Sequence, residues 1–223
     1  MSVTVEPLDD ADEWNGLVEQ AEQSTPFHRW ESLSVFEDHS GATFHPLAGY
    51  KGQEPVGLFP VFTITKGPVT AAFSPPPDLK VHYLGPLQLN FQKLKRRKRD
   101  RRNKRFVEAT VEWLDDAFSP RYTNLRTPVG YDDARPFTWK GYDVAPRYTY
   151  VIDLSRDMDD LLAAFSSDAR KNIQGDYDVD YDIHEGGTDA VERVMEQVQA
   201  RHDEQGEPFP VGDSFVADLY ERL

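Results

Sequence analysis

The densest group of chemically active side chains is a basic run, KLKRRKRDRRNKR, at residues 93–105. It holds ten of the 25 Lys and Arg residues and one acid, whereas the rest of the chain carries 15 basic and 38 acidic residues. Such a run can contact the phosphates of RNA, of acidic lipid headgroups or of a nucleotide-linked substrate. No aromatic residue is interleaved to stack bases, so sequence-specific recognition is not expected. The arginines available to an anion are Arg96, Arg97, Arg99, Arg101 and Arg102.

The basic run has two readings that the sequence leaves open. We expect residues 93–105 to be an exposed loop or the frayed first turns of a helix, because like charges before a helix N-terminus oppose the helix dipole. On one reading the run contacts an anion such as tRNA or a phosphorylated substrate. On the other it is a solvated insertion loop with no partner.

The remaining residues show no known catalytic fingerprint. The chain has no cysteine, which excludes thiolate nucleophiles and Cys-based metal sites. The six histidines show neither H-x-x-x-H nor H-E-x-x-H spacing, so we expect no bound metal. Dinucleotide, P-loop and G-x-S-x-G motifs are also absent, and we expect no permanently bound cofactor. Carboxylates are too numerous for spacing to select a general base, so the catalytic residues are unknown.

The composition predicts a folded, cytoplasmic protein. Hydrophobic residues make up 39% and aromatic residues 12% of the chain, more than a disordered chain contains. No apolar run approaches the roughly 18 residues of a spanning helix, and the acidic N-terminus lacks a signal-peptide layout. The net charge of −14 with only nine lysines favours a halophilic protein from an acidic proteome, the alternative being an ordinary acidic protein. Near 1 M salt the Debye length is about 3 Å, so the basic run would act only by direct contact.

Hydrophobic periodicity predicts an α/β (α+β) chain in which helices and strands are interspersed. Among the strand candidates, RYTYVIDLS at residues 147–155 has the strongest pattern. Loop composition near 130–147 suggests a boundary between a first domain, 1–140, and the N-terminal part of a second, 141–223. Helices are predicted at 9–22, 29–39, 106–118, 156–173, 188–205 and 213–223. Strands are predicted at 44–51, 55–65, 67–73, 122–127, 147–155 and 178–187.

Four short motifs occur in a defined order along the chain. They are P-F-x-x-W, Y-x-G-P, I-D-L-S and R-x-N-I, matched by Pro26, Phe27 and Trp30, by Tyr83, Gly85 and Pro86, by Ile152, Asp153, Leu154 and Ser155, and by Arg170, Asn172 and Ile173. This series resembles the FemAB-like, Fem-type peptidyltransferase-related acyltransferases of the GNAT superfamily. The resemblance runs through nearly the whole chain.

The resemblance implies two tandem GNAT-like domains, each a mixed sheet flanked by helices, that share one substrate cleft. It also implies transfer of an acyl or aminoacyl group from acyl-CoA or aminoacyl-tRNA to an amine, without a covalent enzyme intermediate. Such a site holds donor and acceptor close together, takes a proton from the amine and stabilises an oxyanion. The implied partners are a small-molecule or nucleotide-linked acceptor and tRNA or another anion.

The resemblance and the residue types together nominate six substrate-binding residues: Arg170, Lys171, Asn172, Tyr83, His28 and Trp30. Each nomination has a structural alternative. Arg170 and Lys171 end a predicted helix, where positive charge complements the dipole. His28 and its neighbour Arg29 could reach an anionic acceptor, or could belong to a helix start whose aromatic residues pack inside. Tyr83 could shape a cleft wall or pack its ring at a turn.

The sequence also departs from the family pattern. Gln174 stands where many relatives have a second Arg or Lys after N-I, and the loop that cradles coenzyme A in ordinary GNAT enzymes is missing. Relatives continue with further strands of the second domain, so we expect this chain to be a fragment or to be completed in trans by another chain. Two alternatives remain: a non-catalytic anion- or RNA-binding module that uses residues 93–105, and an inactive fragment.

Overall fold

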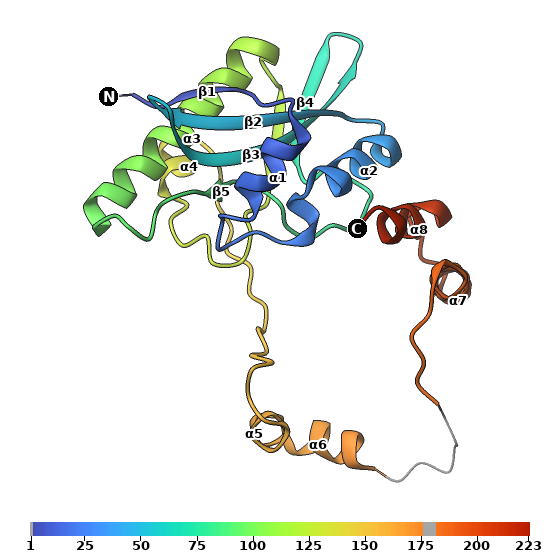
Figure 1. Ribbon diagram of the computed structural model, residues 1–223. Helices are drawn as coiled ribbons and strands as arrows, with labels where there is room; N and C mark the ends of the chain where they lie inside the picture. The colour runs from blue at the N-terminus through green and yellow to red at the C-terminus, as the bar shows by residue number, and fades with distance from the viewer. Residues whose placement is uncertain (1, 176–181) are drawn as a thin grey trace. The chain divides into compact units, whose positions relative to one another are not determined.

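The computed structural model describes residues 2–175 and 182–223, which form two compact units (Figure 1). The larger unit runs to Val144 and resumes at Gly186–Leu223, and the smaller one is Ala145–Glu185. The strands are β1 (Thr4–Pro7), β2 (Thr43–Lys51), β3 (Glu54–Lys66), β4 (Val69–Ser74), β5 (Leu87–Gln88) and β6 (Tyr122–Leu125). The helices are α1 (Ala11–Val18), η1 (Pro26–His28), α2 (Trp30–Ser40), α3 (Arg96–Phe118), α4 (Arg135–Trp139), α5 (Met158–Ala164), α6 (Ser167–Gln174), α7 (Thr188–Gln205) and α8 (Asp213–Arg222).

The six strands of the described residues form one mixed sheet in the larger unit. Their order is β1-β2-β3-β4-β6, with β5 also paired to β3. All pairs are antiparallel except β4 with β6, which are joined by the long crossover through α3. One edge of β3 pairs with β2, and its other edge is shared between β4 and β5. The predicted α/β class, with a mixed sheet flanked by helices, is therefore confirmed.

The sheet has a buried core on each face, because alternate strand residues point to opposite sides. On one face Leu58 and Phe62 of β3 belong to the core that α1 and α2 cover. On the other face Phe59 and Val61 pack into the core that α3 covers. Figure 1 shows α3 on the opposite side of the sheet from α1 and α2.

Helix α3 contains most of the basic run, so the prediction of a loop or frayed turns at residues 93–105 is wrong. The helix begins at Arg96, and a contact with a distant hairpin fixes its early turns. The guanidinium of Arg102 donates to both carboxylate oxygens of Glu54, at 2.9 and 3.2 Å. Lys and Arg are also good helix formers. Together, these contacts and propensities outweigh the repulsion among the cations.

Two glycines allow α3 to approach the sheet closely. Gly49 and Gly57 pair across β2 and β3, under the ring of Phe106. A Cβ on Gly57 would lie 2.3 Å from that ring and 2.7 Å from the Leu87 carbonyl oxygen. A Cβ on Gly49 would lie 2.5 Å from the same ring. The missing side chains therefore set the distance between helix and sheet.

Helices α7 and α8 form where the sequence predicts them, and α8 packs against α2. The ring of Phe215 lies 6.0 Å from that of Phe36. Nε2 of His39 lies 2.6 Å from Oδ2 of Asp218. This part of the chain thus contributes to the core that also holds α1 and α2.

The smaller unit contains α5 and α6 and no strand among its described residues. The strand predicted at 147–155 is wrong, since no other described segment pairs with it. The single helix predicted over 156–173 is two helices, separated by the extended backbone of Phe165. The strand predicted at 178–187 lies partly outside the described residues, and its part from residue 182 onward is not a strand. The domain division near residue 140 stays a prediction.

Candidate functional site

The P-F-H-R-W segment forms η1 and the start of α2, and its histidine is a structural tie. His28 is fully buried. Its Nδ1 accepts a hydrogen bond from the backbone N–H of Thr25 at 3.2 Å, and its Nε2 lies 3.0 Å from the carbonyl oxygen of Leu84. Because Nδ1 accepts, the ring proton belongs on Nε2, which donates to Leu84. His28 therefore joins the start of α2 to the Y-x-G-P turn.

Burial also fixes the charge of His28. Desolvation lowers its pKa to about 4, against the hydrogen bonds to the backbone of Leu84 and Thr25, which raise it. The ring is therefore neutral at pH 7, with both nitrogens in hydrogen bonds. The contacts are those of a packing residue, and the predicted role in substrate binding stays a prediction.

The Y-x-G-P turn has a steric reason for its glycine. Gly85 has a φ of 61°, and a Cβ there would lie 2.8 Å from the carbonyl oxygen of Arg126. Its N–H donates to Oγ of Ser74 at 3.0 Å. Only glycine adopts this backbone conformation in so little space. Tyr83 is half-buried beside this fixed turn.

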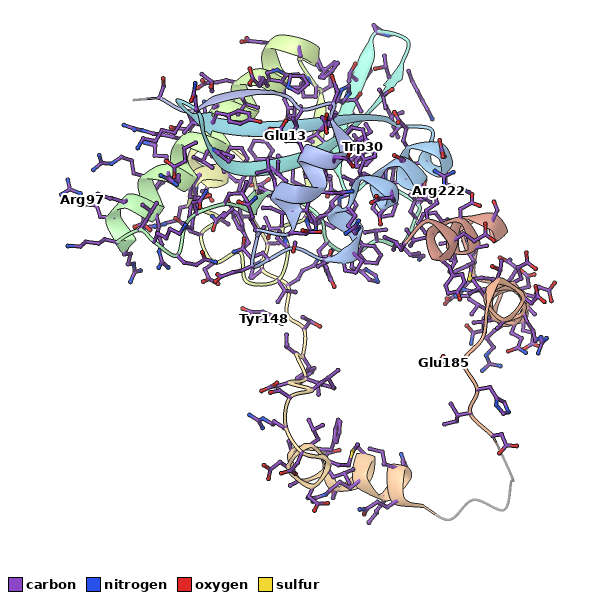
Figure 2. The ribbon with its side chains drawn as sticks, viewed as in Figure 1. Glu13, Trp30, Arg97, Tyr148, Glu185 and Arg222 are labelled. Carbon is purple, nitrogen blue, oxygen red and sulfur yellow. The ribbon has the colours of Figure 1, made fainter. Side chains whose placement is uncertain are left out.

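Trp30 opens α2 and is held by two neighbours (Figure 2). Its backbone N–H donates to Oδ1 of Asn15 at 2.8 Å, and its ring meets that of Phe44 edge-on at 5.5 Å between centroids. The preceding Arg29 lies 3.3 Å from a carboxylate oxygen of Glu31, so its charge is partly neutralised. Trp30 is half-buried and well positioned, and His28 and the Y-x-G-P turn belong to the same connected structure.

The other three nominated substrate residues share α6 in the smaller unit. Ser166 caps this helix by accepting a hydrogen bond from the backbone N–H of Ala169 at 3.2 Å. Arg170 is half-buried, whereas Lys171 and Asn172 are exposed. The helix therefore presents its cations near its C-terminal end, as the sequence predicts. Their role in binding stays a prediction.

The five nominated anion-binding arginines divide into two groups. Arg102 is buried against Glu54, and Arg99 donates to the carbonyl oxygens of Leu94 and Gln92 at 2.8 and 3.1 Å. Both side chains thus have partners within the chain. The exposed arginines are Arg96, Arg97 and Arg101. Figure 2 shows Arg97 extending outward from α3.

One residue beside the basic run escaped the sequence reasoning. Trp139, at the end of α4, is 56% exposed. Nζ of Lys104 lies 5.3 Å from its ring centroid, and the guanidinium carbon of Arg135 lies 5.7 Å away. The run contains no interleaved aromatic along the sequence, but the fold supplies one in space. Its distance along the chain left no local signal.

Two further searches covered the described residues. They contain no group of three or more His, Asp or Glu residues that could hold a metal ion. None of their helices is long and apolar enough to cross a membrane.

Comparison with known proteins finds similarity in structure only. No protein-family model and no curated protein sequence matches the chain. Among solved structures, FemX matches with a TM-score of 0.64 at 12% identity, over 100% of this chain and 55% of FemX. A ribosomal-protein-alanine N-acetyltransferase from Brucella melitensis biovar Abortus 2308 gives a TM-score of 0.40 at 14% identity, over 69% of this chain and 100% of that one.

The FemX match concerns fold. At 12% identity it shows that this chain shares the chain path of part of FemX. The chain spans about half the length of FemX. The mixed sheet flanked by helices that the GNAT resemblance implies is thus found both in the structure and in a protein of similar fold.

Proposed function

We propose that the chain is a FemAB-like N-acyltransferase, or the N-terminal part of one. It moves an acyl group from a CoA thioester, or an aminoacyl group from aminoacyl-tRNA, to an amine. The observation that carries this proposal is the fold similarity to FemX over the whole of this chain. The ordered motif series supports it independently. Because the chain spans about half of FemX, the activity, substrates and partners of a whole protein are all part of the proposal.

The geometry supports a rigid site wall in the larger unit. The hydrogen bond from His28 to Leu84 connects the first motif to the second, and both are anchored in the core. Trp30 and Tyr83 sit at these two anchored segments and are each half-buried. Rigid supports of this kind hold two substrates in reacting geometry, which is the largest demand of an uncatalysed acyl transfer.

The reaction itself has a simple balance. The amine nitrogen attacks the donor carbonyl carbon, a C–N bond forms, and the C–S or C–O bond to the donor breaks. The thiol or ribose hydroxyl that leaves takes up the equivalent of the proton that the amine loses. His28 is unsuited to remove that proton, because it is buried and both its nitrogens are in hydrogen bonds.

Arg170 is the residue proposed to bind donor phosphates. Its half-buried guanidinium makes no hydrogen bond or ion pair with other described residues. A planar guanidinium binds phosphate through two parallel N–H···O bonds, which makes it suited to a CoA or tRNA phosphate. Lys171 would add a second positive charge on the same helix.

Equilibrium binding of the donors tests the proposal. Acetyl-CoA is compared with free amino acids as a control ligand, and aminoacyl-tRNA is compared with the same tRNA after deacylation. We expect saturable binding of at least one donor, with aminoacyl-tRNA preferred over deacylated tRNA. Arg170→Ala should weaken it about 10- to 100-fold, the effect of losing a charged hydrogen bond.

Arg193→Ala is the matched control, since Arg193 is an exposed arginine of α7. It should leave donor binding unchanged. Absence of saturable binding for both donors contradicts the proposal. Equal losses in the two variants would remove Arg170 from it.

A further inference from the structure

Helix α3 presents cations that no other described residue neutralises. Within residues 93–105, Arg102 is bonded to Glu54, Arg99 to backbone carbonyls, and Lys104 to Glu108 at 3.6 Å. Six exposed cations make no side-chain hydrogen bond or ion pair with the described part of the chain: Lys93, Lys95, Arg96, Arg97, Lys98 and Arg101. The structure thus separates structural cations from available ones.

Some of these cations form a stripe that leads to the exposed tryptophan. Arg97, Arg101 and Lys104 follow i, i+4, i+7 spacing and so share one side of α3. At 1.5 Å of rise per residue the stripe is about 10 Å long, roughly three nucleotide steps of about 3.4 Å. Lys104 at its end lies 5.3 Å from the Trp139 ring. Cations and an exposed aromatic therefore follow one another along a continuous surface.

This arrangement opposes the stability of the free helix. The first turn of α3 contains no acid, and the N-cap residue Lys95 makes no side-chain capping bond. Each cation near a helix N-terminus is unfavourable by about 0.3–1 kcal/mol. A bound polyanion would relieve this repulsion. The acidic surface elsewhere on the chain would repel the same polyanion and confine it to α3.

The surface fits a nucleic acid better than a membrane. The apolar residues of α3, including Phe106, Val107 and Val111, face the protein core. A helix that lies on a membrane needs an apolar face to insert, and the outer side of α3 has none. Base stacking on an aromatic side chain, by contrast, contributes about 1–3 kcal/mol and needs only an accessible ring.

We propose that the exposed side of α3 and the ring of Trp139 bind a single nucleic-acid strand. Its phosphates lie along Arg97, Arg101 and Lys104, and one unpaired base stacks on Trp139. The binding is tolerant of sequence, because every base has a face that can stack. This surface is independent of the proposed acyl transfer, and either can fail without the other.

The salt dependence of binding tests the phosphate contacts. The probes are a fluorescein-labelled oligouridylate and the matching oligodeoxythymidylate, measured by anisotropy over KCl concentrations at which circular dichroism shows folded protein. Each single-strand phosphate contact contributes about 0.7 to the slope of log K against log salt. The pair Arg97→Gln and Arg101→Gln should therefore lower the slope by about 1.4. The control pair Lys66→Gln and Arg121→Gln removes two exposed charges from other elements and should leave it unchanged.

Substitution of Trp139 tests the stacking. Trp139→Ala should weaken binding about 5- to 100-fold without changing the salt slope, and Trp139→Phe should retain most of the affinity. The strand should also quench the tryptophan emission of the wild type more than that of Trp139→Phe. Tighter binding of the ribo- or deoxyribo-probe identifies the natural strand within the same proposal.

Four outcomes would overturn the proposal. They are absence of saturable binding of both probes, equal salt slopes for the two double variants, full affinity in Trp139→Ala, and binding to phosphatidylserine vesicles in place of either strand. Sedimentation velocity excludes one artefact. If α3 instead binds the acidic surface of a second copy, self-association disappears in the Arg97→Gln, Arg101→Gln pair and neither probe binds.

Discussion

Strand β3 and the segment at 147–154 have similar apolar sequences and opposite surroundings. In β3, Leu58, Phe59 and Val61 are fully buried between the two helical layers. In the other segment Tyr150 is 98% exposed and Leu154 is 81% exposed, and neither belongs to a strand. Both stretches satisfy the rules by which strands are recognised in sequences.

The difference lies in the neighbours of each segment. β3 has β2 along one edge and β4 and β5 along the other. The 147–154 segment has no pairing partner among the described residues. A two-sided apolar strand gains its stability from cross-strand neighbours, and without them its side chains remain in water. Apolar alternation thus identifies a surface that can be buried, but not what buries it.

The largest contrast should come from removing one ring from β3. Phe59 is fully buried between the rings of Phe106 and Phe137, with centroids 6.4 and 6.5 Å away. Phe59→Ala should lower the free energy of unfolding by about 3–5 kcal/mol, through lost burial and the cavity left behind. Urea denaturation followed by circular dichroism measures this. A loss below about 1 kcal/mol would mean that the core on the α3 side does not stabilise the fold.

His28 predicts how the stability of the larger unit changes with pH. Its pKa is about 4 when folded and 6.5 in the unfolded chain. Above pH 6.5 the ring is neutral in both states, so it adds no pH dependence. Between pH 6.5 and 4 the unfolded chain takes up a proton that the folded chain does not, so the free energy of unfolding falls by about 3 kcal/mol as pH falls. Below about pH 4 the loss is complete.

The test is a comparison of wild type with His28→Gln by urea denaturation at several pH values. Carboxylates titrate in the same range in both proteins, so the difference between the two curves isolates the histidine. We expect the wild type to lose more stability than the variant between pH 6.5 and 4. Parallel curves would show that His28 is accessible to protons in the folded state.

A smaller effect should follow from filling the space under Phe106. Gly57→Ala places a methyl group against that ring and the Leu87 carbonyl, and should cost about 1–3 kcal/mol. Gly16→Ala in α1 meets nothing within 4 Å and should instead stabilise by about 0.5–1 kcal/mol. Thermal unfolding of the two variants distinguishes them by sign. Equal shifts would contradict the close helix–sheet packing.

The smallest effect should come from the exposed segment. Tyr150→Ser should change the free energy of unfolding by less than about 0.5 kcal/mol, because the side chain is in solvent in both states. Chymotrypsin should also cleave after Tyr148 and Tyr150 before it reaches the buried aromatic residues of β3 (Figure 2). Protection of these two tyrosines, or a large loss of stability, would mean that the segment is buried in solution.

Much of the larger unit is predictable because its signals are local. The hairpin of β2 and β3 is read from alternating apolar residues on either side of a turn at Gly52, which has a φ of 65°. Helix α2 is read from Trp30, Leu33 and Phe36 at helical spacing, and all three contribute to one core. The ordered motif series likewise pointed to the fold that the structure and FemX share.

The features that the sequence hid depend on residues far apart. Arg102 stabilises the start of α3 through Glu54, which belongs to a hairpin much earlier in the chain. Trp139 meets Lys104 only because α4 folds back beside α3. His28 looks like an exposed candidate ligand until Leu84 is placed on its ring. In each case the local pattern identifies a residue type, and the tertiary contact decides what it does.

The most direct test of the proposed transferase is donor-dependent amide formation. The protein is incubated with acetyl-CoA or aminoacyl-tRNA and a mixture of amines, and products are identified by mass spectrometry. The account predicts a new amide from at least one donor, strongly reduced in Arg170→Ala and retained in Arg193→Ala. No amide from either donor above the protein-free rate would contradict it.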